Sequence, residues 1–212
     1  MLDDRVSVLL QGIAIGIGLC CTLGPQSLFV LRQGMRGEAA LRVATICSLG
    51  DLLMAAAGAA GFGVFLATFP SLVGTASWAS AIFVLLYGGK LLLETLQRQP
   101  GDAGVVRPGR RACVTMTALA LTLLNPQVYL EMVGVVGSLA LRVPAAERAF
   151  FALGVMLVSP LWFYGLAFGG QRLTSLFGRW YALRAVDLLT AAVLLAIGAV
   201  MVIAEATQAV EP

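Results

Sequence analysis

Two short segments, each containing a proline, interrupt long apolar stretches of the chain. The first is Leu23-Gly24-Pro25-Gln26, and the second, in the other half of the chain, is Leu124-Asn125-Pro126-Gln127. Proline lacks an amide hydrogen and collides with the preceding helical turn, so it ends or kinks a helix. Within lipid, the freed backbone groups need partners from protein or from water. Two such breaks in corresponding places of two halves are typical of a transporter binding site.

The composition places these stretches in a membrane. The chain has 212 residues, of which 59% are hydrophobic and 12% are charged, whereas a soluble domain carries about 25% charged residues. The length allows six spans of about 20 residues with short connections. We therefore predict an all-α membrane protein embedded in the lipid bilayer, with spans at residues 6–31, 43–65, 72–93, 112–141, 149–170 and 187–204.

The charged residues indicate an orientation in the membrane and not a nucleic-acid partner. The formal net charge is only +3, and most arginines lie in the connections after the first, third and fifth predicted spans. Basic connections stay in the cytoplasm. These three connections are therefore predicted to be cytoplasmic, with both termini on the opposite face.

The six predicted spans divide into two halves, residues 1–96 and 112–212, joined by a basic loop at 97–111. Because three is odd, the halves would have opposite orientations, and each would begin with a broken span. This pattern predicts a 3+3 inverted repeat, with two unrelated proline kinks as the alternative. Small residues in Gly12-x-x-x-Gly16, around Gly58, and in Gly165-x-x-x-Gly169 predict close helix packing, either within the chain or between two copies in a homodimer.

The breaks also predict a binding chemistry. Gly24 is suited to end one half-helix, Asn125 is suited to cap one, and proline fits the first helical position. A half-helix that starts within the membrane presents free amides and the positive end of its dipole, which attract an anionic group such as a carboxylate. The residues predicted to bind substrate at the breaks are Gly24, Pro25, Gln26, Asn125, Pro126 and Gln127.

Two acidic residues fall inside predicted spans. Asp51 lies near the middle of the second span and Glu131 lies beyond the second break. A carboxylate at this depth is costly and usually faces a cavity or a partner, so each could hold a substrate cation, carry a coupling proton, or form a structural pair. Asp187 is instead predicted to form a local ion pair with Arg184.

At this point the residues resemble a known family. The segments from Gly24 to Gly34 and from Leu124 to Glu131 are similar to signature segments of the lysine exporter (LysE) superfamily, most closely its lysine/arginine exporter branch. The resemblance implies export of basic amino acids from the cytoplasm across the bacterial inner membrane, coupled to protons or to the membrane potential. It adds Tyr129 and Trp162 to the predicted substrate-binding residues.

Other classes of function stay open on the sequence alone. The alternatives are an exporter of another small amino acid, a metal-cation exporter using Cys20, Cys21 and Cys47, a passive channel, and a membrane-embedded enzyme. The chain has no histidine and no metal-ligand spacing, which disfavours the enzyme and predicts neither a cofactor nor a bound metal. The four cysteines fit small apolar packing residues.

Overall fold

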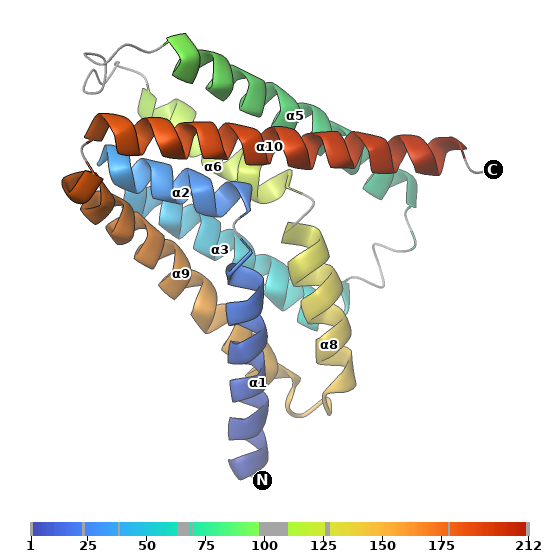
Figure 1. Cartoon of the computed structure of the whole chain (residues 1–212). Helices are drawn as coiled ribbons and strands as arrows, with labels where there is room; N and C mark the ends of the chain where they lie inside the picture. The colour runs from blue at the N-terminus through green and yellow to red at the C-terminus, as the bar shows by residue number, and fades with distance from the viewer. Residues whose placement is uncertain are drawn as a thin grey trace.

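The structure is a computed structural model that describes residues 2–22, 24–37, 39–62, 68, 70–97, 110–125, 128–177 and 179–210. In these ranges the chain is helical, with turns and no strand, as the sequence predicts (Figure 1). The elements are α1 (Leu2–Cys20), α2 (Pro25–Arg36), α3 (Ala40–Ala59), α5 (Pro70–Gln97), α6 (Arg110–Leu123), the π-helix η2 (Tyr129–Val135), α8 (Val136–Arg142), α9 (Arg148–Phe177) and α10 (Arg179–Val210).

Four of the described helices are long and apolar enough to cross a bilayer, namely α3, α5, α9 and α10. The pair α1 and α2 would make a fifth span, bent by 74° at its break. The fourth predicted span, residues 112–141, is divided among α6, η2 and α8. The membrane class is therefore recovered, whereas the count of six spans and the 3+3 repeat remain predictions.

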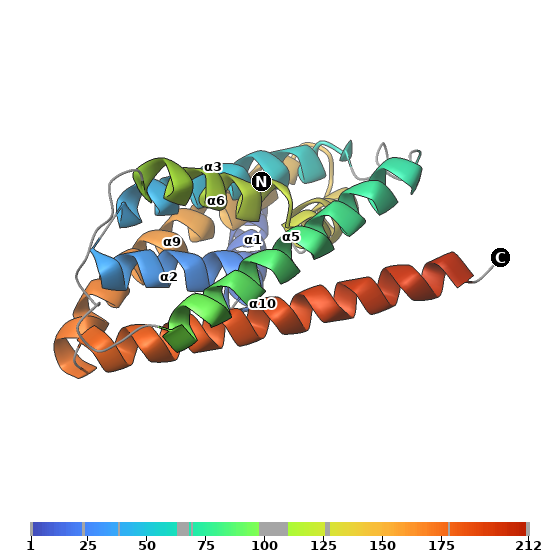
Figure 2. The ribbon, with the colours of Figure 1, turned by 90° about the horizontal axis from the view of Figure 1, so that it is seen from above.

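Helices α3 and α9 lie against each other, and the segments of both broken spans pack on them (Figures 1 and 2). The broken pair α1–α2 packs mainly on α9, and α6, η2 and α8 pack on α3. Helix α5 runs alongside α10, and α10 also contacts α2. Each broken span thus packs on the first unbroken helix of the other half, which is α9 for α1–α2 and α3 for α6, η2 and α8.

Glycines allow two of these helix crossings. A Cβ added to Gly12 of α1 would lie 2.2 Å from the Phe151 carbonyl oxygen, and one added to Gly154 of α9 would lie 2.3 Å from the Leu9 oxygen. Gly58 of α3 and Gly137 of α8 approach each other in the same way. The predicted close packing is therefore found at Gly12 and Gly58.

Gly165 and Gly169 differ from the glycines at these two helix crossings. A Cβ added at either position would meet no described heavy atom within 4 Å. Gly165 and Gly169 therefore lie on a face of α9 that does not pack within the described part of the chain, although Ala167 between them is buried. A homodimer through this face stays a prediction.

The first break has the backbone geometry expected from its sequence. Helix α1 ends at Cys20, and Gly24 is extended, with φ −78° and ψ 176°, as the residue that precedes α2. Pro25 occupies the first turn of α2, where its missing amide hydrogen costs nothing. Gly24 thus starts the second half-helix and does not terminate the first.

The second break begins where α6 ends at Leu123. The Asn125 carbonyl oxygen accepts a hydrogen bond from the Val128 amide at 3.1 Å, which ties Asn125 to the start of the next helix. Pro126 and Gln127 lie outside the described residues. Both breaks come to the same region of the molecule, which contains the site described next.

Candidate functional site

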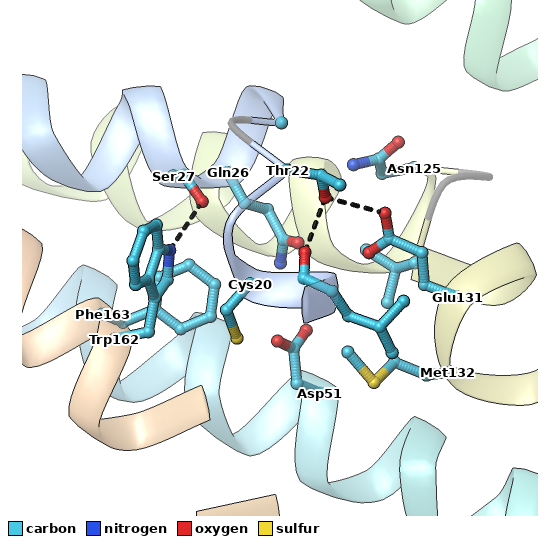
Figure 3. A pocket seen from close by; sticks show the side chains of 13 residues that line it. Cys20, Thr22, Gln26, Ser27, Asp51, Asn125, Glu131, Met132, Trp162 and Phe163 are labelled. Atoms are coloured by element: carbon cyan, nitrogen blue, oxygen red, sulfur yellow. Dashed lines mark hydrogen bonds between the residues drawn. The ribbon is translucent and has the colours of Figure 1, made fainter. Parts of the chain in front are cut away.

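A hollow lies between the two breaks, where α2, α3, η2 and α9 meet (Figure 3). Its volume is about 380 Å³ when its open mouth is included, but the centre of a water molecule can occupy only about 30 Å³ of it. At roughly 10–15 Å³ per water, this is room for two or three waters. The lining residues are Leu19, Cys20, Thr22, Gly24, Gln26, Ser27, Asp51, Asn125, Val128, Glu131, Met132, Trp162 and Phe163.

Asp51 reaches into this hollow from α3 (Figure 3). Its side chain is buried, with 5% of its surface exposed. The Ser159 hydroxyl of α9 donates a hydrogen bond to Asp51 Oδ2 at 2.9 Å, whereas Oδ1 is buried without a hydrogen-bond partner among the described residues. A buried carboxylate oxygen without a partner is costly, so Oδ1 is ready to accept a hydrogen bond from a ligand.

Glu131 enters the hollow from the first turn of η2 (Figure 3). Its Oε1 lies 3.0 Å from the Thr22 hydroxyl, which directly precedes the first break. The same hydroxyl lies 2.6 Å from the Leu19 carbonyl oxygen. Because a hydroxyl has one proton, it donates to one of the two at a time. This contact joins the two breaks at the mouth, where Thr22 is exposed.

Two further hydrogen bonds hold the start of α2 in place. The Gln26 amide donates to the Thr122 hydroxyl of α6 at 3.0 Å. The Trp162 indole of α9 donates to the Ser27 hydroxyl at 3.1 Å. The side chains of Gln26 and Ser27 are thus fixed, while their backbone amides, being in the first turn of a helix, have no partner within that helix.

The lining is acidic. Asp51 and Glu131 are charged lining residues, and the described lining contains neither lysine nor arginine. The hollow therefore combines two carboxylates with the amide end of α2, which favours a ligand carrying both cationic groups and a carboxylate. In the part of the chain that the structure describes, no group of three His, Cys, Asp or Glu residues is placed to hold a metal ion.

Only some of the predicted binding residues line the hollow. Pro25 is buried at the start of α2 and does not line it. Tyr129 does not line it either, and its hydroxyl donates to the Leu123 carbonyl oxygen at 2.6 Å, across the second break. Pro126 and Gln127 fall outside the described residues. The predicted residues that do line the hollow are Gly24, Gln26, Asp51, Asn125, Glu131 and Trp162.

The sequence interpretation did not assign an amino-acid-binding role to several lining residues. Cys20 and Thr22 sit just before the first break, and Phe163 follows Trp162. Each of them lies next to a predicted break or next to Trp162, a predicted binding residue. This nearness in the sequence is a signal that could have identified them. Met132 and Val128 carry no such signal beyond their position next to the second break.

Asp187 has partners that the sequence interpretation missed. Its side chain is fully buried, and its two oxygens accept hydrogen bonds from Arg32 and Arg36 of α2. Arg184, the predicted partner, has its guanidinium over the Trp180 ring, 5.7 Å from the ring centroid. These partners are far from Asp187 in the sequence, so local spacing could not indicate them.

Comparison with known proteins finds relatives that are named arginine exporters. The arginine exporter protein ArgO of Salmonella paratyphi A is 37% identical over 164 residues, which cover 76% of this chain and 77% of the relative. The protein of the same name from Klebsiella pneumoniae is 38% identical over 159 residues, covering 74% and 75%. No solved structure matches.

The family match covers most of the chain. Residues 17–205 match the LysE type translocator family, and this range contains both breaks, both acidic lining residues and α9. A translocator is a transporter and not an enzyme. The chain therefore belongs to the LysE type translocator family.

Proposed function

We propose that this protein exports arginine from the cytoplasm across the bacterial inner membrane, with lysine as a second substrate. The curated relatives of about 37% identity are named arginine exporters, and the family is one of translocators. The observation that carries the proposal is Asp51 Oδ1, a buried carboxylate oxygen with no described hydrogen-bond partner in a hollow between two helix breaks.

The chemistry of arginine matches that of the hollow. Arginine carries one carboxylate and two cationic groups, the α-amino group and the guanidinium. The amides of Gln26 and Ser27 at the start of α2 are suited to the carboxylate, and Asp51 and Glu131 are suited to the two cations. The lysine side chain has the same charges, so this arrangement accepts both.

Export of a cation against the membrane potential needs a source of energy, and a coupled ion can supply it. A cytoplasm that is negative inside opposes outward movement of one positive charge by about 2.3 kcal/mol per 100 mV. A proton that moves inward for each arginine exported would remove this opposition. Asp51 and Glu131 are the lining carboxylates, so we assign them the coupling proton as well as the substrate cations.

The hollow must widen for transport, because its present space suits only two or three waters. The helix packing supports a 3+3 inverted repeat, in which movement of one half against the other would widen the hollow. The segments of each broken span pack on the first unbroken helix of the other half, and α3 with α9 and α5 with α10 pair across the halves. A pseudo-twofold axis would produce these pairings, and transporters of this kind rock one repeat against the other.

Replacing Asp51 tests the proposed function. Asp51→Asn keeps the shape of the side chain and removes its charge, and loss of one partner from a buried charge pair costs about 2 kcal/mol or more. In proteoliposomes, efflux of radiolabelled arginine at a concentration well below KM should fall by about 30-fold. Glu205→Gln on α10, which does not line the hollow, is the matched control and should transport at the parent rate.

The same vesicles test the substrate class. Arginine and lysine should be exported, and leucine should not, because leucine lacks the second cationic group. Leucine efflux at the rate of arginine would overturn the basic specificity, and unchanged arginine efflux in Asp51→Asn would remove Asp51 from the mechanism. Efflux that ignores an imposed proton gradient would reject proton coupling.

A further inference from the structure

A second cluster of charged residues lies apart from the hollow, at the other end of α2. Arg32 and Arg36 are each one-twentieth exposed or little more, and Asp187 of α10 is fully buried. Arg32 Nε donates to Asp187 Oδ1, and Arg36 Nη2 donates to Asp187 Oδ2 at 3.1 Å. Arg32 Nη1 also donates to the Tyr87 hydroxyl of α5 at 3.2 Å. The cluster therefore ties α2 to both α10 and α5.

This cluster stands between the hollow and one end of the molecule. Arg32 follows the lining residue Ser27 by five positions, or about 7.5 Å along α2. Of the four residues between them, Leu28, Phe29 and Val30 are at most 1% exposed and Leu31 is half-buried. Phe29 packs edge-on against Tyr87. On this side the hollow is sealed by buried side chains, whereas on the other side Thr22 is exposed.

The sealed end is also the basic end. The end of α2, the start of α3, the start of α6 and the junction of α9 with α10 all lie there (left side of Figure 1). By the distribution of positive charge, this is the cytoplasmic end. Arginine that enters from the cytoplasm must therefore pass the cluster of Arg32, Arg36, Tyr87 and Asp187, which we call the α2–α10 lock.

In the part of the chain that the structure describes, the opposite end has no counterpart to the lock. Under the proposed inverted repeat, the contact of α2 with α10 corresponds to a contact of α8 with α5. Among the described residues, α10 packs along α2, but α5 has no comparable packing on α8 (Figures 1 and 2). The two ends of the molecule thus differ in the way that alternating access requires.

We propose that the α2–α10 lock is the cytoplasmic gate of this transporter, and that the structure shows the state in which this gate is closed. The proposal rests on the transport function proposed above. Buried ion pairs are costly to form and still more costly to leave with one partner removed. The lock is therefore suited to two discrete positions, one with all partners in place and one with them separated and hydrated.

The native Cys20 provides a reporter that does not depend on arginine. It lines the hollow and is a free thiol. With Cys21, Cys47 and Cys113 replaced by alanine, the rate at which a small membrane-impermeant methanethiosulfonate modifies Cys20 can be measured from each face, in inside-out and right-side-out vesicles. In the parent, we expect modification to be slow from the face that carries the basic end.

Opening of the lock should speed the modification of Cys20 from the basic face alone. We expect Asp187→Asn to raise the rate by roughly tenfold, because the closed state loses the partner of two buried arginines while the open state does not. Arg36→Gln removes one of the two hydrogen bonds and should give a smaller rise. Glu205→Gln, on the same helix but outside the lock, is the matched control and should label like the parent.

Arg36→Gln keeps the test valid if Asp187→Asn does not fold, as judged by a monodisperse elution profile in detergent. Rates that equal the parent rate from the basic face in every folded lock variant would overturn the gate. So would a parent that labels equally fast from both faces. If the parent exports arginine but a folded lock variant loses efflux with unchanged Cys20 labelling, the transport function stands and the gate is rejected. If the parent does not export arginine, the proposed function fails instead, so the two proposals fail separately.

Discussion

At the scale of single residues, the orientation of Asp51 depends on Ser159. The Ser159 hydroxyl holds Oδ2 at 2.9 Å and leaves Oδ1 without a described partner. A hydrogen bond to a charged group contributes about 1.5–3 kcal/mol, so without it the carboxylate can turn away from the substrate position. Ser159 therefore acts through Asp51, and its loss should change binding more than turnover.

We expect Ser159→Ala to raise KM for arginine efflux by about tenfold, with a much smaller change in the maximal rate. Ser159→Thr keeps the hydroxyl and should restore most of the affinity. Ser138→Ala is the matched control, since its hydroxyl donates to the Val135 carbonyl oxygen, away from the lining. A KM for Ser159→Ala equal to that of the parent would show that Asp51 is held by other contacts.

At the scale of elements, the contact of α1 with α9 depends on the absence of side chains. A Cβ on Gly12 would lie 2.2 Å from a backbone oxygen of α9, which cannot move aside without displacing the helix. In the membrane, such packing is a main force that holds helices together. The position of α1, and hence of the first break, depends on this crossing.

We expect Gly12→Ala to destabilise the protein by about 1–3 kcal/mol through overpacking, seen as a lower Tm of the purified protein in detergent. Gly18→Ala is the control on the same helix, because an added Cβ there meets no described heavy atom within 4 Å. Its Tm should be unchanged or slightly raised, since alanine favours a helix over glycine. Equal Tm values for the two variants would contradict this role of Gly12.

At the scale of the whole molecule, α9 is long enough to cross the membrane. It runs without interruption from Arg148 to Phe177, about 45 Å at 1.5 Å per residue, which exceeds a hydrocarbon core of about 30 Å. Its two ends should therefore lie on opposite faces. The basic end at the start of α10 should be the cytoplasmic one.

Single cysteines in a cysteine-free background test this orientation. An impermeant maleimide should label Gln171→Cys, near the end of α9, in inside-out vesicles only. It should label Ala145→Cys, before the start of α9, in intact right-side-out membranes only. Both positions are exposed. Labelling of both from one face would mean that α9 does not cross, and the reverse pattern would place the basic end outside.

The prolines show what local sequence can determine. Pro25 follows a glycine and interrupts the chain between α1 and α2, as predicted. Pro160 lies inside α9, which continues through it. Because the same residue type gives both results, the outcome depends on its neighbours and on the helices that pack around it.

The sequence by itself determined the membrane class, the helical content and the first break, because apolarity, helix length and the chemistry of proline act within a few residues. It also placed Asp51 inside a span. Only the tertiary structure decided that Ser159 holds Asp51, that Thr22 meets Glu131, and that Asp187 pairs with Arg32 and Arg36. These partners are more than one hundred positions apart, so the packing of α2, α3, η2, α9 and α10 has to form before they meet.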